Sequence, residues 1–257
     1  MESIYLLEWS FIPADYFGCD IEIVRDDYIA SIRHGKITAS IDRHIYDSDP
    51  KLHDEIEVSL RDRFDGAMLV SHQAYDLSGP TRVLTHPDGR RDFFIDCKTG
   101  VLTVTGYSPD IRVTSPNGEI IYDSKQVRAE RIMHVGEQIA KHREKAQPLR
   151  AMIDSYDNAI REPQNELIHL YEVREALHLR FGGKMEARSA IGAPPSAWNR
   201  LGDLCNDKNL RQGRHRGKAG TLLRDATHVE LKEAQEICVQ LIELYLRYLD
   251  AHGPEQP

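Results

Sequence analysis

The chain has 257 residues, of which 33 are Lys or Arg and 41 are Asp or Glu, so its formal net charge at pH 7 is -8. Hydrophobic residues make up 40% and charged residues 29% of the chain, a composition typical of globular proteins. Such an acidic chain is excluded as a whole-surface binder of nucleic acid or membrane, so any polyanion must meet a local basic patch. The length suits two domains of about 100–150 residues each.

The sequence carries no marks of a membrane or secreted protein. No run of apolar residues approaches the roughly 18 that a membrane span needs. The first residues include Glu2 and Glu8 and lack the basic start of a signal peptide. The four cysteines are Cys19, Cys97, Cys205 and Cys238. They are scattered and form no Cys-x-x-Cys pair, so we expect reduced thiols, a soluble cytoplasmic protein, no metal and no cofactor.

Residues 1–123 carry the alternation and turn signals of β-strands. Tyr28–Ile41 places β-branched and aromatic residues on both sides of His34-Gly35, which predicts a hairpin turning at that dipeptide. Asn117-Gly118 predicts another tight turn, because Asn and Gly tolerate positive φ angles. Short apolar runs expected in this domain are Ala67–Val70, Thr81–Thr85, Phe93–Ile95, Ile111–Thr114 and Glu119–Tyr122. A sandwich, a barrel and a curved sheet fit this pattern equally.

After Asp123 the hydrophobic period changes from that of strands to that of helices. Residues 124–161 are predicted to form two helices that link the halves, and the second begins at Pro148, which suits the first turn of a helix. The expected fold class is therefore α+β, with a β-rich N-terminal domain followed by an α-helical C-terminal domain.

Residues 162–257 are predicted to form the helical domain. One helix opens near Pro163 and stops at Gly182-Gly183. The last helix begins at a capping box formed by Thr227 and Glu230. Two of its leucines, Leu244 and Leu249, fall outside or at the edge of its main apolar stripe. That extra apolar surface favours a partner helix, and a symmetric homodimer is the commonest solution.

A further predicted helix is capped by Ser196 and ends about Asn206, and the segment between it and the last helix is strongly basic. Its cations, within eleven residues that contain no acid, are Lys208, Arg211, Arg214, Arg216 and Lys218. His215 lies among them, and Gly213 and Gly217 allow the backbone to approach a ligand closely. Because planar guanidinium groups bind phosphate oxygens, the basic segment, residues 208–218, is the candidate site for phosphate or nucleic acid.

The segment also contains the residues for acid–base chemistry on RNA. A neutral His215, favoured by neighbouring cations, could take the proton of a ribose 2′-hydroxyl without a metal. Arg211 and Arg214 would hold the phosphate and stabilise its developing charge. The residues assigned to nucleic-acid binding are Lys208, Arg216, Lys218 and Asn206. The plainer interpretation is a solvated loop, or one whose arginines pair with acids of the other domain, with His215 in an ordinary hydrogen bond.

Arg174 and His178 interrupt the apolar stripe of the helix that opens near Pro163. They lie four residues apart and therefore on the same side of that helix. A core-facing arginine usually pairs with a buried carboxylate, and histidine is often a satisfied core residue. The alternative is that this helix packs beside the basic segment, so that Arg174 and His178 line the same cleft.

A polar stretch in the first half was also considered as a metal site. Its acids and histidines are Asp42, His44, Asp47, Asp49, His53 and Asp54. They have no recognised ligand spacing, so the stretch is interpreted as a surface loop.

From Leu167 to Leu249 the chain resembles the HEPN superfamily, helical domains found in many metal-independent bacterial ribonucleases. The resemblance lies in the helical pattern and in an arginine–histidine element before the last helix, Arg211-Gln-Gly-Arg214-His215. Three residues separate Arg211 from His215, fewer than in the usual motif of the family. The resemblance implies RNA cleavage in a defence or toxin context, with an active site shared across a homodimer.

Three functions therefore stay open at the level of sequence. The first is an RNA-directed protein, and specifically a metal-independent endoribonuclease with His215 as base or acid. The second is a non-catalytic sensor or adaptor whose basic segment docks nucleic acid, a nucleotide or an acidic partner. The third is a structural subunit of a larger assembly. In each case the β-rich domain could receive a regulatory ligand or protein.

Overall fold

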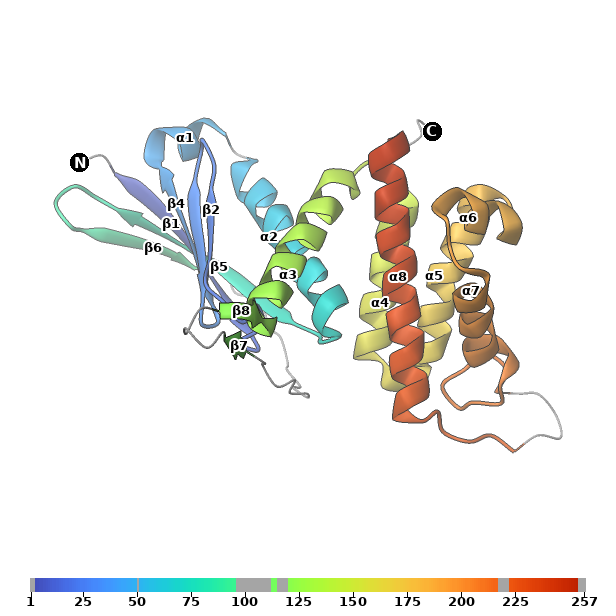
Figure 1. The fold of residues 1–257 in the computed structure, drawn as a ribbon. Coiled ribbons are helices and arrows are strands. Elements are labelled where there is room, and N and C mark those ends of the chain that lie inside the picture. Colours follow the sequence, from blue (N-terminus) through green and yellow to red (C-terminus); the bar gives the residue numbers. More distant parts are fainter. Residues whose placement is uncertain (1–2, 50, 96–111, 115–119, 217–221, 254–257) are drawn as a thin grey trace. The chain divides into compact units, whose positions relative to one another are not determined.

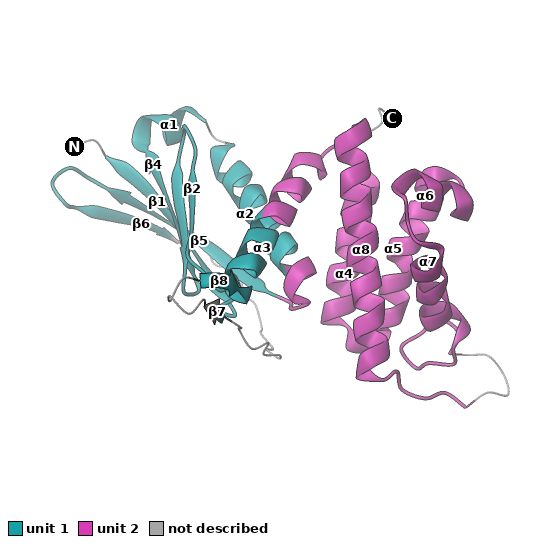
Figure 2. Ribbon diagram, viewed as in Figure 1, with its two compact units in different colours: residues 1–67, 75–133 teal, residues 68–74, 134–257 magenta. Residues whose placement is uncertain are grey.

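The computed structural model describes residues 3–49, 51–95, 112–114, 120–216 and 222–253 (Figure 1). The chain divides into two compact units, residues 1–67 with 75–133, and residues 68–74 with 134–257 (Figure 2). A six-stranded sheet lies in the first unit, and the second is helical, which confirms the α+β class. The division falls inside a helix, at residues 133/134, within the range 124–161 that the sequence assigns to linking helices.

The first unit is built on antiparallel strands. Its strands are β1 (Ile4–Ile12), β2 (Ile21–Val24), β3 (Ile29–Arg33), β4 (Lys36–Asp42), β5 (Asp76–Thr85), β6 (Arg91–Ile95), β7 (Arg112–Thr114) and β8 (Ile120–Asp123). Its helices are α1 (Arg43–Ser48), α2 (Leu52–Ser71) up to residue 67, and α3 (Ser124–His142) up to residue 133. The six-stranded sheet has the order β2-β3-β4-β1-β5-β6, and β7 pairs with β8.

The predicted hairpin at His34-Gly35 is confirmed. His34 and Gly35 have φ angles of 43° and 77°, the positive values that a tight two-residue turn needs. The turn joins β3 to β4, with Arg33 opposite Lys36 in the register. Asn117-Gly118, the other predicted turn, lies outside the described residues.

Helix α2 corrects the expectation that residues 1–123 contain only strands and turns. The run Ala67–Val70, expected among the strands, lies inside this helix. Its buried residues Leu52, Ile56, Leu60 and Phe64 recur every four positions and are at most 2% exposed, which is a helical period. The Phe64 ring lies 5.2 Å from that of Phe11 in β1, so α2 packs on one face of the sheet.

The polar stretch of residues 42–54 is likewise not a loop. It forms α1 and the first turn of α2. Asp54 and Glu55 lie in that first turn, where acidic side chains complement the helix dipole. Of the acids of this stretch, Asp54 therefore supports a helix start.

The second unit is a helical bundle. Its elements are the ends of α2 and α3, then α4 (Gln147–Arg161), the 3₁₀ turn η1 (Pro163–Asn165), α5 (Glu166–Phe181), α6 (Lys184–Ile191), α7 (Pro195–Gly202), the π-helical turn η2 (Asp203–Asp207) and α8 (His228–His252). The predicted helix starting at Pro148 is confirmed, but it belongs to the bundle core and is no linker. Its residues Leu149, Met152, Ile153 and Tyr156 are at most 1% exposed.

Helices α5 and α8 lie side by side in this bundle. Gln235 of α8 donates a hydrogen bond of 2.8 Å to Glu166, and Cys238 Sγ lies 3.3 Å from the Leu170 carbonyl oxygen. The later residue of α5, Leu170, contacts the later residue of α8, Cys238, so the two helices run parallel. The residues expected to leave apolar surface on α8 are packed instead: Leu249 is 2% exposed and Leu244 contacts the core. The sequence argument for a dimer surface there was wrong.

Candidate functional site

The basic segment is held against the bundle by its own backbone. Its described part, residues 208–216, follows η2 directly. The Arg214 N–H donates to the Cys205 carbonyl at 3.0 Å, and the Arg211 N–H donates to the Arg224 carbonyl at 3.0 Å. At Gly213, an added Cβ would lie 3.2 Å from the Cys205 carbonyl oxygen. The close approach that this glycine permits is thus made to the protein itself.

Lys208 is engaged by the start of α8. Its ammonium donates to Glu230 Oε1 at 2.9 Å, and Arg224 donates two hydrogen bonds of 2.7 Å to the same carboxylate. Glu230 also completes the capping box, which is confirmed: its N–H donates to Thr227 Oγ1 at 3.2 Å. The Arg224 guanidinium, with the other donors, holds the pKa of Glu230 well below its usual range. One carboxylate therefore caps a helix and anchors the basic segment.

Arg216 ties the segment to the turn before α5. Its guanidinium donates to the Gln164 carbonyl oxygen at 2.6 Å and to Asn165 Oδ1 at 2.8 Å. It also donates to the Gly213 carbonyl at 3.1 Å. These contacts occupy much of its donor capacity, so Arg216 braces the segment.

Arg214 rests on helix α5. Its guanidinium lies 4.4 Å from the centroid of the Tyr171 ring and donates to Glu175 Oε1 at 2.7 Å. Arg174 lies 5.1 Å from the same ring and donates to the Trp198 carbonyl oxygen at 3.2 Å. The expected proximity of this helix to the segment is thus observed. Arg174 has an aromatic and carbonyl environment rather than the buried carboxylate that the sequence suggested.

Arg211 and His215 are the loosely held side chains of the segment. The Arg211 guanidinium lies 3.9 Å from Asp225 Oδ1, with exposed fractions of 63% and 69%. His215 is exposed and has no hydrogen bond or ion pair with another described residue. The side chains of Arg211 and His215 are therefore accessible to a ligand from solvent, while hydrogen bonds hold the backbone of the segment in place.

Two further predicted site residues, Asn206 and His178, do not join this group. Asn206 donates to Asp207 Oδ1 at 3.0 Å. His178 is exposed on α5 and lies outside the buried stripe, so its expected core position was wrong. Lys218 lies outside the described residues.

Two residues of the site were missed in the sequence, Tyr171 and Glu175. They lie one helical turn apart on α5, and Arg174 is three residues after Tyr171, a spacing that places side chains together. That local pattern was visible. Their partner Arg214 is 39 positions from Glu175, and no local spacing reveals such a contact.

Glu166, the first residue of α5, carries a buried carboxyl group. Its residue is 5% exposed, and burial raises its pKa to about 7 although the Gln235 hydrogen bond opposes the shift. A raised pKa in the folded chain means that its stabilising contribution is complete below the ordinary value of 4.5 and is lost as the pH rises through about 7.

We therefore expect Glu166→Gln to abolish this pH dependence. At pH 8 the variant should have a higher free energy of unfolding than the parent, by on the order of 2 kcal/mol, and the gain should fade towards pH 4.5. Urea unfolding of the full chain across this pH range measures it. Glu236→Gln, at an exposed position of α8, is the control, and an equal gain there would contradict the assignment.

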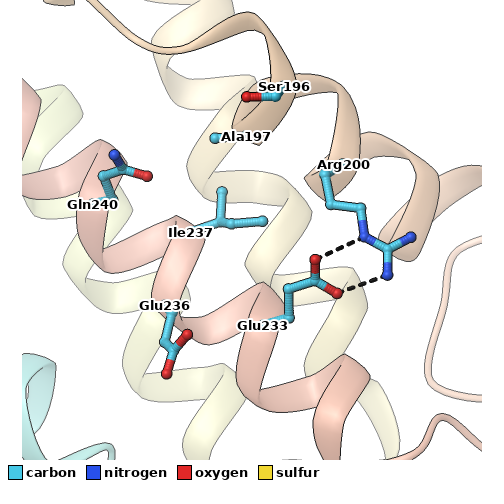
Figure 3. Close-up of a pocket in the computed structure, with 7 residues that line it drawn as sticks. All are labelled: Ser196, Ala197, Arg200, Glu233, Glu236, Ile237 and Gln240. Atoms are coloured by element: carbon cyan, nitrogen blue, oxygen red, sulfur yellow. Dashed lines mark hydrogen bonds and ion pairs between the residues drawn. The ribbon is translucent and has the colours of Figure 1, made fainter.

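A pocket of about 350 Å³ opens elsewhere on the same unit (Figure 3). Its lining residues are Ser196, Ala197 and Arg200 of α7 and Glu233, Glu236, Ile237 and Gln240 of α8. Arg200 donates to both carboxylate oxygens of Glu233, at 2.9 and 2.7 Å. This ion pair fills the polar side of the pocket, and we assign it no role.

The part of the chain that the structure describes contains no group of three or more His, Cys, Asp or Glu side chains placed to hold a metal ion. Within the same part, every helix is too short or too polar to cross a membrane. Burial raises the pKa of the Cys205 and Cys238 thiols, so both favour the unreactive protonated form.

Comparisons with known protein families, with curated proteins and with solved structures find no match to this chain.

Proposed function

We propose that the helical unit is RNA-directed and that Arg211 and His215 make its contact with a phosphate of the RNA chain. The observation that carries the proposal is the contrast within the basic segment. Lys208, Arg214 and Arg216 are fastened to the bundle, whereas Arg211 and His215 are exposed and loosely held. A loop that served only solubility would need no such bracing.

The ion pair between Arg211 and Asp225 is weak enough for a phosphate to displace Asp225 from the guanidinium. Arg211 and Asp225 are both largely exposed, and their 3.9 Å pair is of the kind that contributes about 0–1 kcal/mol. A phosphate oxygen accepting a charge-assisted hydrogen bond from the guanidinium replaces it with a stronger contact.

Arg211→Ala should weaken binding of a single-stranded oligouridylate by about three- to tenfold at low salt and reduce the slope of log affinity against log salt by about 0.7. One phosphate contact is lost while the braced fold remains. Fluorescence anisotropy over a salt series measures both quantities. Arg247→Ala, at an exposed arginine of α8, is the matched control. Equal effects of the two substitutions, or no binding by the parent at low salt, would refute the proposed contact.

Cleavage of the bound RNA is the first form of this proposal. It is favoured by the exposure of His215, four residues after Arg211 in the same segment, and by the HEPN resemblance of the segment. That resemblance also supports a cytoplasmic location, a defence or toxin role and a homodimer whose two basic segments share one site. No metal is required for the proposed proton transfer.

A docking adaptor is the second form. It is favoured by the ion pair of Arg214, the residue expected to clamp the phosphate, with Glu175. In this form the segment binds RNA without cleaving it, and the β-rich unit receives the regulatory ligand or partner. Cleavage assays on His215 variants, described below, separate the two forms.

A further inference from the structure

Two arginines converge on one aromatic ring in the helical unit. Arg174 and Arg214 lie 5.1 and 4.4 Å from the Tyr171 ring centroid. Cations placed over an aromatic face are held by the quadrupole of the ring, while their N–H edges stay available for acceptors. Tyr171 thus positions two guanidinium groups that come from distant parts of the sequence.

The position of Arg174 is built into the packing. Its guanidinium also lies 5.4 Å from the Trp198 ring centroid, and Trp198 is fully buried. A Cβ added at Gly202 would lie 2.0 Å from Arg174 Nη1. The guanidinium therefore lies close over this glycine, and its two ring contacts and its hydrogen bond to the Trp198 carbonyl oxygen hold Arg174 in place.

Glu175 is the anion that pairs with Arg214. Its carboxylate accepts a 2.7 Å hydrogen bond from Arg214, and the two side chains are 45% and 36% exposed. Two guanidinium groups lie near the Tyr171 ring, and one of them, that of Arg214, is paired with the Glu175 carboxylate. A carboxylate and a phosphate offer guanidinium groups the same kind of acceptor, so Glu175 fills the place that a phosphate oxygen would take.

We propose that Arg174, Arg214 and Tyr171 form a second phosphate site, and that Glu175 occupies it until an RNA phosphate displaces the carboxylate. The inference rests on the RNA-directed function proposed above and adds its regulation. Glu175 sets a threshold: weak anions do not displace it, whereas an RNA chain already held at Arg211 presents a phosphate at high local concentration.

Glu175→Gln should therefore strengthen RNA binding. The amide keeps the shape of the side chain but removes the competing charge, which should raise the affinity for a single-stranded oligouridylate about five- to tenfold at low salt. The salt slope should steepen by about 0.7, because Arg214 gains a phosphate contact. Glu175→Asp, which retains the carboxylate, should stay close to the parent.

Glu172→Gln is the matched control for this experiment. Glu172 lies on the same helix and is 46% exposed, and it contacts Ser155 and His169 instead of the basic segment. Its substitution should change affinity by at most about twofold. The gain of Glu175→Gln should also vanish when Arg214→Ala is added, since the gain acts through that guanidinium.

The outcomes separate this inference from the function on which it rests. A loss in Arg211→Ala without a gain in Glu175→Gln overturns the gating role alone. A gain that persists without Arg214 also overturns it. A gain that needs Arg214, together with no loss in Arg211→Ala, supports the second site and overturns the Arg211 contact. No binding by any variant overturns both.

Discussion

His215→Ala should reduce RNA cleavage by about 10²–10⁴-fold, the usual contribution of a positioned proton-transfer group. The imidazole is exposed and has no partner among the described residues, so it is free to accept the 2′-hydroxyl proton. Binding should survive, because Arg211 remains. The products should end in a 2′,3′-cyclic phosphate or a 3′-phosphate, and cleavage should continue in excess chelator. Gel analysis of end-labelled RNA measures rate and product together.

His178→Ala is the matched control for this prediction. His178 is also exposed and belongs to the same unit, and nothing in the described contacts connects it with the basic segment. The RNA pool must be broad, since a defence nuclease acts only after its trigger is present. Full activity of the His215 variant, or a strict need for magnesium, would exclude this mechanism. RNA binding without any cleavage would favour the docking form.

The sequence predicted those elements of the fold that local chemistry specifies. The His34-Gly35 turn and the Thr227–Glu230 box each depend on residues within a few positions of one another. Helix α2 was missed because its apolar positions are separated by charged residues and follow a polar stretch. The four-residue spacing of apolar side chains from Leu52 to Phe64 identifies a helix only once the sheet is known to provide a face on which these side chains are buried.

The sequence shows the basic segment but not the ion pairs that its side chains form. Arginines concentrated around His215 are visible in the sequence, and the structure exposes that histidine. Which arginines are free depends on acids from other elements, Glu175 of α5 and Glu230 of α8. These acids lie too far along the chain from Arg214 and Lys208, which they contact, for any sequence spacing to predict the pairs. The bundle therefore reassigns Arg214 from a free clamp to a paired side chain.

Glu230→Ala should lower the free energy of unfolding by about 2–4 kcal/mol, because one substitution removes several kinds of contact. The side-chain half of the capping box, in which Glu230 Oε2 accepts from the Thr227 N–H, is lost at the start of α8, whereas the backbone N–H of residue 230 can still donate to Thr227 Oγ1. Arg224 and Lys208 lose the carboxylate that accepts their hydrogen bonds. Glu230 is 11% exposed in its side chain, so solvent screens these contacts less than it screens surface pairs.

Urea unfolding of the full chain, followed by circular dichroism, measures this loss. Glu236→Ala is the control, since its 3.9 Å pair with Lys232 joins two side chains that are each 59% exposed; it should change stability by about 0.5 kcal/mol or less. A similar small effect at Glu230 would show that the cap and the basic segment are not coupled through this carboxylate.

The pKa of the Glu230 carboxyl predicts how the difference in stability between the parent and a Glu230 variant changes with pH. The Arg224 hydrogen bonds and the other donors depress the pKa of Glu230 in the folded chain. Its contribution is therefore complete above the ordinary value of 4.5 and is lost as the pH falls below 4.5 towards the depressed pKa. The stability gap between the parent and Glu230→Gln should be constant from pH 6 to 8, on the plateau about 1.5 units or more above that value, and should narrow in acid. A gap that widened on acidification would contradict the anchoring role of this side chain.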